Sequence, residues 1–254
     1  MNTLRNILNG FDSITLDEMD SVTLMDRVDS KYAFTQDRLT DLFERMKPSY
    51  RVLEVNTHRI SRYESVYFDT KDFDLYHHHH TGRTNRYKIR FRKYVESDLS
   101  FFEIKFKNNK DRTIKSRVRH GTIEEIIQGE PKIFLSKKTH FTAHDLEAKL
   151  WVNFSRITFV NRFSPERVTI DLDLTFKNNE TVLTMNNLVI AETKQNKSMR
   201  SEFVKLMKEK HIREGSISKY CFAASCLYKE LKNNNFRPQL KIFNKLICGN
   251  LTSA

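Results

Sequence analysis

The stretch RYKIRFRKY, residues 86–94, alternates between cationic and apolar side chains as far as Arg92. Because the side chains of a β-strand point alternately to its two faces, this spacing predicts a strand with one cationic face and one apolar face. A single strand of this kind is compatible with the solvated outer face of an ordinary sheet. The cationic face carries Arg86, Lys88, Arg90 and Arg92, and the opposite face carries Tyr87, Ile89 and Phe91.

Two further segments repeat this pattern directly after the first. They cover residues 101–107 (FFEIKFK) and 113–119 (TIKSRVR), and the connections between the three segments are short and polar. The spacing predicts a meander of antiparallel strands. Like charges on neighbouring strands destabilise a sheet, so three such strands indicate a surface that an anion neutralises. The cations expected on this face are Lys105, Lys107, Lys115, Arg117 and Arg119, together with one acid, Glu103.

Five other segments also predict strands, which gives about eight candidates and is enough to close a barrel. They are residues 31–34, 60–68, 157–162, 167–174 and 187–194. Closure with the polar faces inward would form a charged tunnel whose apolar outer faces need a cover. In residues 167–174, the alternation places Thr169, Asp171 and Asp173 on the polar face.

Four segments carry the signals of helices that could form this cover. Thr35 precedes an apolar stripe that stops at Pro48, and Thr122 opens a capping box whose helix Gly129 would end. Residues 203–207 carry another stripe, and Ser218 opens a helix near the carboxyl end. We therefore expect an α+β fold, an antiparallel eight-stranded β-barrel tunnel jacketed by helices. No linker interrupts the chain, so we expect a single domain of residues 1–254 with a core of about 28–230.

The composition indicates the kind of partner and the compartment. The chain has 254 residues, with 44 Lys and Arg against 32 Asp and Glu, and its formal net charge of +12 favours an anionic partner such as nucleic acid, acidic lipid or phosphate-rich molecules. Its three cysteines form no CxxC pair. No apolar run approaches the ~18 residues of a membrane helix, and no signal-peptide pattern opens the chain. We expect a cytoplasmic protein without a transmembrane segment, and its oligomeric state stays open.

A set of short motifs follows the chain in order. They are KY at 31–32, SRYESVYFDT at 61–70, GR at 82–83, KIRFRKY at 88–94, EIKFK at 103–107, RVTID at 167–171, AETK at 191–194 and SKY at 218–220. This ordered set resembles the VTC domain, a family of polyphosphate polymerases among the triphosphate tunnel metalloenzymes. The resemblance implies an eight-stranded tunnel in which the γ-phosphate of ATP moves onto pyrophosphate or a growing polyphosphate chain, with Mn²⁺ or Mg²⁺.

Carried over by position, the resemblance also implies phosphate ligands and one metal ligand. Arg binds phosphate oxygens bidentately, Lys acts as a point charge, and a hard divalent cation takes carboxylate oxygen. The sequence departs from fungal members at Val160, where they have Tyr, and at Ser216, where they have Lys. The implied catalytic residues are Arg90, Arg92, Lys105, Arg162 and Lys219, the substrate-binding residues are Lys31, Arg62, Lys88, Lys115, Arg117 and Lys194, and the metal ligand is Glu192.

Several alternatives stay open from the residues alone. Glu192 could pair with a tunnel Lys, and Lys219 could be an exposed surface residue. Asp171 and Asp173 could pair with a tunnel Arg or assist the metal. Residues 77–80, four His in a segment expected to be extended, would point to alternate sides and are not expected to form a metal site. A tunnel triphosphatase and a non-catalytic polyanion-binding module are the alternative functions. Nucleic acid is not expected, because the aromatic side chains alternate onto the face opposite the cations.

Overall fold

The computed structural model describes residues 2–20, 27–110, 112–197 and 199–246. One mixed but mainly antiparallel sheet dominates it, and its main path has the strand order β2-β11-β9-β8-β4-β5-β6-β7. These are the eight strands that the sequence predicts, with β8 much longer than expected. Their bounds are β2 (Arg27–Thr35), β4 (Ser61–Asp69), β5 (Arg86–Tyr94), β6 (Leu99–Lys107), β7 (Thr113–His120), β8 (Glu147–Asn161), β9 (Glu166–Lys177) and β11 (Leu188–Asn196).

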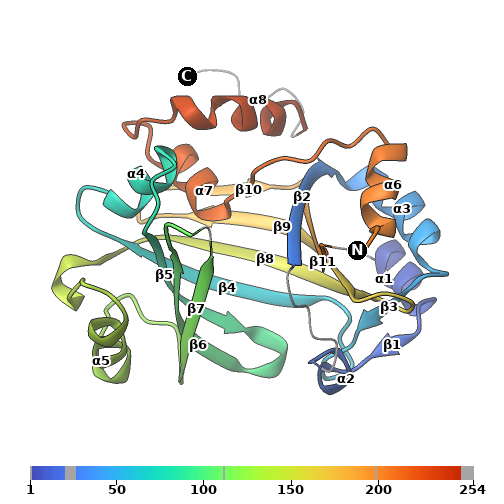
Figure 1. Ribbon diagram of the computed structural model, residues 1–254, viewed down its shortest axis with the longest axis horizontal. Helices are drawn as coiled ribbons and strands as arrows, with labels where there is room; N and C mark the ends of the chain where they lie inside the picture. Colours follow the sequence, from blue (N-terminus) through green and yellow to red (C-terminus); the bar gives the residue numbers. More distant parts are fainter. Residues whose placement is uncertain (1, 21–26, 111, 198, 247–254) are drawn as a thin grey trace.

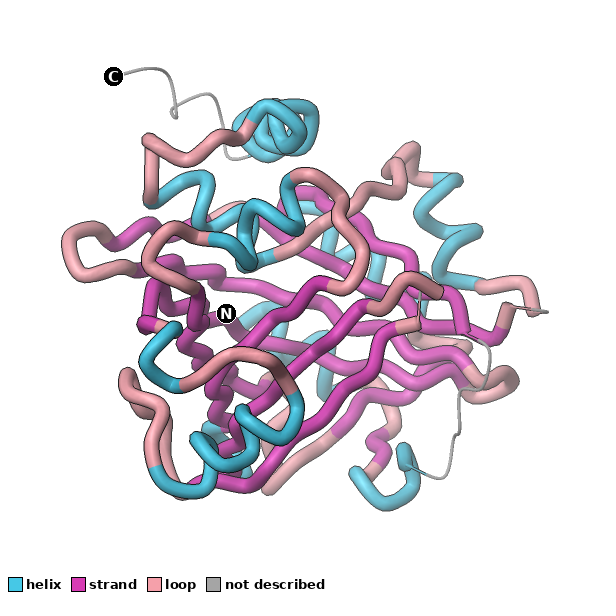
Figure 2. Tube along the Cα trace, turned by 60° about the vertical axis from the view of Figure 1, so that its left-hand side comes forward, coloured by secondary structure: helices cyan, strands magenta, loops and turns pink. Residues whose placement is uncertain are grey.

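Three short strands extend the sheet beside this path. β1 (Ser13–Ile14) pairs with β3 (Tyr50–Leu53), β3 pairs with β8, and β10 (Val182–Met185) pairs with β9. The sheet is curved, so that β5, β6 and β7 run steeply across the direction of β8 and β9 (Figure 1). The Cα trace shows the same curved sheet from another direction (Figure 2).

The tunnel fold is present, but hydrogen bonds do not close the sheet within the described part of the chain. The path ends at β2 on one side and at β7 on the other. The outer edge of β2 is occupied instead by the segment that precedes helix α7 (Lys219–Leu227). There Tyr32 forms an isolated bridge with Glu214, and the Gly215 N–H donates to the Lys31 carbonyl at 2.9 Å. The expected continuous barrel is therefore replaced by a curved sheet whose opening this segment borders.

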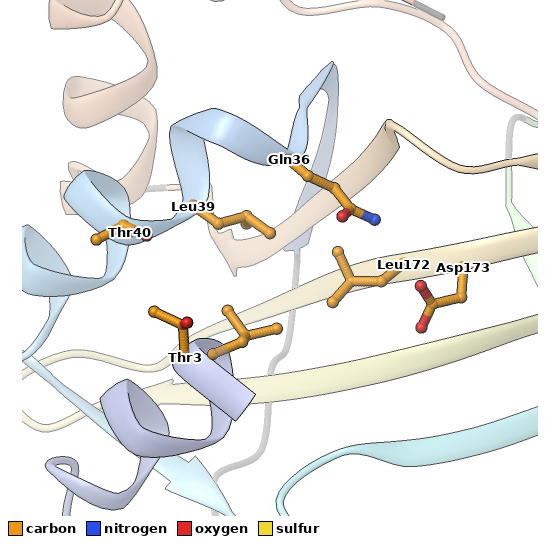
Figure 3. A pocket seen from close by; sticks show the side chains of 7 residues that line it. Thr3, Gln36, Leu39, Thr40, Leu172 and Asp173 are labelled. Atoms are coloured by element: carbon orange, nitrogen blue, oxygen red, sulfur yellow. The ribbon is translucent and has the colours of Figure 1, made fainter. Parts of the chain in front are cut away.

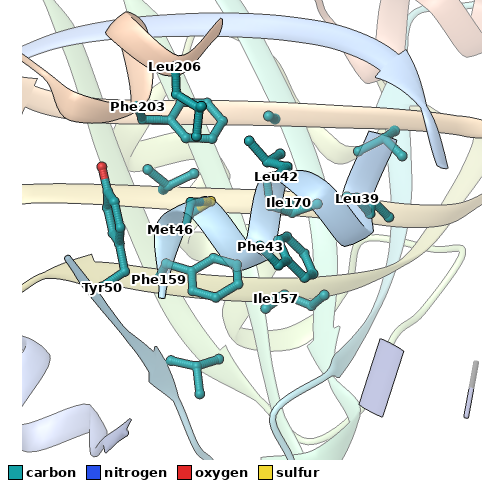
Figure 4. Close-up of a cluster of buried hydrophobic side chains, with 14 of the residues drawn as sticks. Leu39, Leu42, Phe43, Met46, Tyr50, Ile157, Phe159, Ile170, Phe203 and Leu206 are labelled. Carbon is teal, nitrogen blue, oxygen red and sulfur yellow. The ribbon is translucent and has the colours of Figure 1, made fainter. Parts of the chain in front are cut away.

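One group of helices covers the apolar outer face of β8, β9, β2 and β11. It comprises α1 (Asn2–Asn9), α3 (Leu39–Met46) and α6 (Glu202–Glu209), and α3 follows Thr35 through a 3₁₀ turn over Gln36–Arg38. Side chains from these helices and strands form one buried cluster, which includes Leu8 and Phe11 from the amino-terminal end. Figure 4 shows how Leu42, Phe43 and Met46 of α3 lie against Ile157, Phe159 and Ile170 of the sheet.

The remaining helices lie at the other end and beside β6 and β7. They are α4 (Asp74–His80), α7 (Lys219–Leu227) and α8 (Arg237–Leu246), with α5 (Gly129–Lys138) against β7. The short α2 (Leu16–Asp20) is the exception: it lies beside β1, and its Met19 packs against Ile14 and Leu53 (Figure 1). Further 3₁₀ turns cover Val95–Ser97, Ala143–Asp145 and Asn234–Phe236. No helix of the described ranges combines the length and the apolar character needed to cross a membrane.

Two local predictions about helices are wrong. Residues 122–125 form no helix, because Glu124 binds the His120 ring at 3.0 Å, and the helix begins at Gly129 instead of ending there. The four His are helical, not extended: the Asp69 carboxylate accepts the N–H groups of Leu75 and Tyr76 at 2.8 and 2.9 Å, which anchors the first turn of α4.

A β-bulge in β9 changes which side chains face the interior. The β8–β9 register pairs Ser155 with Leu172 but Asn153 with Thr175, and Asp173 has φ of 51°. Leu172 accordingly packs under α3, whereas Leu174 packs with the cluster around α7. Figure 3 shows Asp173 beside Leu172 in a hollow that Thr3 and Gln36 also line. The expectation that Asp173 shares the face of Asp171 is therefore wrong.

Candidate functional site

The concave face of the sheet carries a single cluster of charged side chains, which we call the interior cluster. All strands of the main path except β4 contribute a charge to it, β4 contributes Tyr63 and Tyr67, and α7 contributes its first residue. Its residues interact electrostatically across the strands. The charged members are Lys31, Lys88, Arg90, Arg92, Glu103, Lys105, Lys115, Arg156, Asp171, Glu192, Lys194 and Lys219.

Arg90 forms the first buried ion pair of the interior cluster. Its Nε lies 2.7 Å from Glu103 Oε2, its Nη2 contacts the same oxygen, and its Nη1 donates to the Tyr67 hydroxyl at 2.8 Å. Burial alone would raise the pKa of Glu103, but the guanidinium groups of Arg90 and Arg92 lower it to about 2. Glu103 is therefore ionised and fixes the orientation of Arg90.

Asp171 holds two cations at once, and one of them was not predicted from the sequence. Its carboxylate accepts Arg156 Nε at 2.6 Å and Nη2 at 2.8 Å, and it also accepts Lys219 Nζ. Asp171 is only 1% exposed, and these two cations hold its pKa at about 2 against the effect of burial. The sequence left open whether Asp171 pairs with a tunnel Arg or assists the metal, and in the structure it pairs with Arg156. Lys219 is half-buried in this pair and is not a free surface residue.

Glu192 lies on β11 between several cations. Its Oε2 is 2.9 Å from Lys194 Nζ, and it faces Lys31 across the β11–β2 pair. Burial would raise the pKa of Glu192, but Lys194 and Lys31 lower it far below its usual value. The carboxylate is therefore ionised inside the cluster. It forms the ion pair with a tunnel Lys that the sequence left open.

Other interior cations have no carboxylate within ion-pair distance among the described residues. Arg92 is 8% exposed and contacts only the Ser65 hydroxyl, at 3.1 Å, and the rings of Tyr63 and Phe154. Burial and the neighbouring Arg90 lower the pKa of Arg92. Arg90 and burial likewise lower the pKa of Lys105 well below its usual value. These uncompensated charges, which also include Lys31 and Lys88, make the cluster a site for an anion.

The segment before α7 binds two of these lysines through neutral oxygens. Lys31 Nζ donates to the Ile217 carbonyl at 2.8 Å, and Lys88 Nζ donates to the Ser218 hydroxyl at 2.9 Å. Ser218 also caps α7 by accepting the Cys221 N–H at 3.3 Å. The amino end of α7 therefore lies in the interior cluster, where its N–H groups and Lys219 both favour negative charge.

Besides Arg117, two of the predicted phosphate ligands lie outside the interior cluster. The Arg62 side chain is 67% exposed and pairs with Glu96 at 2.8 Å, because it points to the side of β4 opposite Tyr63. Arg162 follows the end of β8 and pairs with Asp12 at 2.7 Å, and Val160 is buried with Ile14. Neither arginine is placed to bind an anion held by the cluster.

Arg156, and not the expected Arg162, is the cation that β8 contributes to the interior cluster. It was missed because the sequence predicts a strand only from residue 157, whereas β8 begins at Glu147. The signal that could have identified it is alternation with the apolar Ile157 and Phe159 that face the opposite side. Arg117 also lies outside the interior cluster. It is exposed on the edge strand β7, opposite Glu103, and its guanidinium lies 4.4 Å from the centroid of the Phe101 ring.

Aromatic side chains share the interior with the cations, contrary to the expectation drawn from the Arg86–Tyr94 strand. Tyr67 lies under Arg90, and the Tyr63 and Phe154 rings, stacked with centroids 5.0 Å apart, lie beside Arg92 and Arg156. β4 and β8 supply these rings, and the alternation in residues 86–94 carries no information about which side chains of β4 and β8 face the interior. Phe154 and Tyr67 are 4% and 5% exposed, so they support the cations and offer no open stacking surface to bases.

The family model described as the VTC domain matches residues 26–228. The chain belongs to the VTC-domain family. The match includes every strand of the main path and the whole of α7, so the interior cluster lies entirely within the VTC domain. This family has the triphosphate tunnel fold, which agrees with the curved eight-strand path and its charged concave face.

Solved structures with low sequence identity also match this VTC domain. An adenylate cyclase candidate from Bacillus halodurans is 11% identical with a TM-score of 0.45, and covers 77% of this chain and 96% of its own. The PH1819 protein from Pyrococcus horikoshii OT3 is 13% identical with a TM-score of 0.45, and covers 81% and 99%. An adenylyl cyclase candidate from Hippeastrum, described as having a dominant triphosphatase activity, is 12% identical with a TM-score of 0.42, and covers 78% and 96%. No curated protein matches the sequence.

Proposed function

We propose that this VTC-domain protein is a polyphosphate polymerase that transfers the γ-phosphate of ATP to the end of a polyphosphate chain inside the interior cluster. The observation that carries the proposal is the group of buried cations without a carboxylate partner, above all Arg92 and Lys105. A phosphate chain supplies several negative charges in a row, which suits cations contributed by successive strands. A single carboxylate ligand would neutralise only part of them.

The chemistry requires little covalent participation by the protein. An oxygen of the acceptor's terminal phosphate attacks the γ-phosphorus, the bond from that phosphorus to the β,γ-bridging oxygen breaks, and ADP leaves with the electron pair. The chain becomes one phosphate longer and no other reactant is needed. Phosphoryl transfer is catalysed mainly by positioning and by neutralisation of charge, so the cluster needs no nucleophilic side chain. In this proposal Arg90, Arg92, Lys105, Arg156 and Lys219 bind the transferred group, and Lys31, Lys88, Lys115 and Lys194 bind the rest of the chain.

The residues fit a divalent cation that is bound mainly by substrate. Among the described side chains, no group of three or more His, Cys, Asp or Glu is gathered around one point. Mg²⁺ commonly uses one or two carboxylates and completes its coordination with water and substrate phosphates. Glu192 suits this role, because its ion pair is with one Lys, whereas Asp171 and Glu103 are committed to arginines. When bound, Mn²⁺ or Mg²⁺ would be held by Glu192 and would offset the charge that develops in transfer.

The product of the reaction tests the proposal. Purified protein is incubated with ATP, Mn²⁺ and a pyrophosphate primer, and the products are separated by gel electrophoresis and assayed for ADP. A ladder of polyphosphate chains with an equivalent amount of ADP is the expected result, and chelation of the metal should abolish it. Orthophosphate and ADP without a ladder would show a tunnel triphosphatase, with water as the acceptor. Binding of polyphosphate with no ADP under any condition would show a non-catalytic module.

A further inference from the structure

Tyr67 lies in the middle of the interior cluster, although no feature of the sequence singled it out as a ligand. It stands on β4 opposite Arg90 of β5, and its hydroxyl oxygen accepts from Arg90 Nη1 at 2.8 Å. The side chain is 5% exposed. Because the guanidinium supplies a hydrogen to the oxygen, the phenolic proton points elsewhere, and none of the described residues accepts it.

The ring of Tyr67 is fixed from the other side. It stacks on Tyr220 of α7, with the ring centroids 5.2 Å apart and the planes inclined by 24°. Tyr220 donates its own hydroxyl to Asp69, the carboxylate that also anchors α4. These contacts hold the Tyr67 ring against rotation out of the cluster, so its hydroxyl is presented at a constant position beside Arg90.

We propose that the Tyr67 hydroxyl donates a hydrogen bond to a phosphate oxygen of the anion that Arg90 and Arg92 bind. The inference rests on the proposed function, because it takes the interior cluster to hold a phosphate chain. A neutral phenol adds a donor without adding a charge, whereas a further cation at this point would increase the repulsion among Lys88, Arg90 and Arg92. The donated bond would be charge-assisted and therefore among the stronger hydrogen bonds in proteins.

The surroundings of Tyr67 give this bond a pH dependence. Lys88, Arg90 and Arg92 face the hydroxyl from β5, with Glu103 of β6 behind Arg90; Tyr220 and Asp69 lie on the α7 side, and apolar Leu150 is its β8 neighbour. Burial raises the pKa of Tyr67, but the three cations outweigh it and lower the pKa to about 8. Below this pH the phenol can donate. Above it, the phenolate has no proton and repels the phosphate.

The test compares the affinity of Tyr67→Phe and of the wild-type protein for inorganic tripolyphosphate. Calorimetry without metal measures this affinity at several pH values on both sides of about 8. Phe keeps the stacked ring and removes the hydroxyl. The wild type should bind about tenfold to a hundredfold more tightly at the lower pH, the range for a lost hydrogen bond to a charged group. The ratio should fall to one or below at the higher pH, where the phenolate donates no hydrogen bond and repels the phosphate. Comparing the two proteins cancels the ionisation of the ligand and of the lysines.

Tyr220→Phe is the matched control. It removes a buried hydroxyl from the ring that stacks on Tyr67, so it should lower the melting temperature and leave the pH dependence of the affinity as in the wild type. Equal affinities of the wild type and Tyr67→Phe, or a ratio that does not change with pH, would overturn the inference. Failure to make polyphosphate by a protein that shows the expected ratio would overturn the proposed activity alone.

Discussion

Arg92 and Arg62 carry the same guanidinium group in opposite surroundings. Arg92 is 8% exposed with no carboxylate in ion-pair range among the described residues, whereas the Arg62 side chain is 67% exposed and bound to Glu96. A buried charge without a partner is unfavourable until an anion reaches it, and an exposed pair contributes little to stability or binding. The two residues therefore make a test of whether burial in the cluster, and not charge alone, determines anion binding.

We expect Arg92→Ala to weaken tripolyphosphate binding by at least about tenfold, because a charged, buried hydrogen-bonding group is removed. The free energy of unfolding should change by less than about 1 kcal/mol, since lost packing and relieved repulsion from Arg90 oppose each other. Calorimetry and thermal melting measure the two quantities. Arg62→Ala should leave both nearly unchanged. Similar losses of affinity in the two variants would contradict the assignment of the interior cluster.

Glu192→Gln tests the metal ligand. Gln keeps the shape and can still accept a hydrogen bond from Lys194, but it removes the negative charge that a divalent cation needs. Turnover of ATP should fall by orders of magnitude, while tripolyphosphate affinity without metal stays unchanged or rises slightly. The measurement is turnover across a Mn²⁺ titration, beside a melting curve. Near-normal turnover at saturating Mn²⁺ together with lower stability would show that Glu192 serves only as the partner of Lys194.

At the scale of elements, strict alternation made the strands readable from the sequence. The segment 86–94 is β5 to the residue, and all eight predicted strands form the main path. The predictions of strand faces and strand bounds were wrong where the two-residue alternation of side chains is interrupted or was not followed far enough along the chain. The bulge at Asp173 shifts the alternation by one position, and the strand predicted from residue 157 omits the part of β8 from Glu147 to Arg156. The bulge leaves no local signal, because it depends on the register with a neighbouring strand. Arg156 does have a local signal, the alternation with Ile157 and Phe159.

The site was predictable to the extent that its residues lie on well-alternating strands. Lys88, Arg90, Arg92 and Lys105 are where the pattern of β5 and β6 places them. Arg62 was misjudged because a motif match does not specify a face, and Arg162 because the strand ends before it. Tyr67 gave no signal, since a Tyr in a strand is usually part of a core. Only the pairing of β4 with β5 brings its hydroxyl to Arg90.

The amino end of α7 supports a prediction at this scale. Ser218→Ala removes the cap of α7 and the acceptor of Lys88, so stability should fall by about 1 kcal/mol. Because fraying also loosens Lys219, tripolyphosphate affinity should fall by up to about fivefold. Ser201→Ala is the matched control. The Ser201 hydroxyl caps α6 outside the interior cluster by accepting the Val204 N–H at 2.8 Å, and the substitution removes this cap. It should lower the melting temperature without changing affinity, and an unchanged affinity in Ser218→Ala would separate α7 from the site.

At the scale of the whole molecule, the fold keeps like charges together by covering the outside of the sheet. The outer clusters under α1, α3 and α6, and under α5, pack large aromatic and aliphatic side chains against the back of the charged strands. Burial of this apolar surface stabilises the curved sheet by an amount that repulsion within the interior cluster partly offsets. The cations cannot move apart without breaking the strands that carry them. An anion bound in the interior cluster would therefore offset this repulsion.

This balance predicts that tripolyphosphate stabilises the protein strongly. Ligand at about 100 times its dissociation constant should add about 2.7 kcal/mol to the free energy of unfolding, because it binds the folded state and not the unfolded chain. The rise in melting temperature should shrink as salt is added, since screening weakens the attraction between a partly exposed phosphate chain and the cations. Scanning calorimetry at low and high salt measures this change.

Arg92→Ala serves as the control for this measurement, because it leaves most of the net charge of +12 in place while it removes one buried cation. A general preference of a basic protein for anions would stabilise this variant as much as the wild type. Binding in the interior cluster predicts a clearly smaller rise for the variant at the same ligand concentration. A melting temperature that does not respond to tripolyphosphate at low salt would contradict the cluster as a phosphate site, because no carboxylate of the described residues lies within ion-pair distance of Arg92 or Lys105.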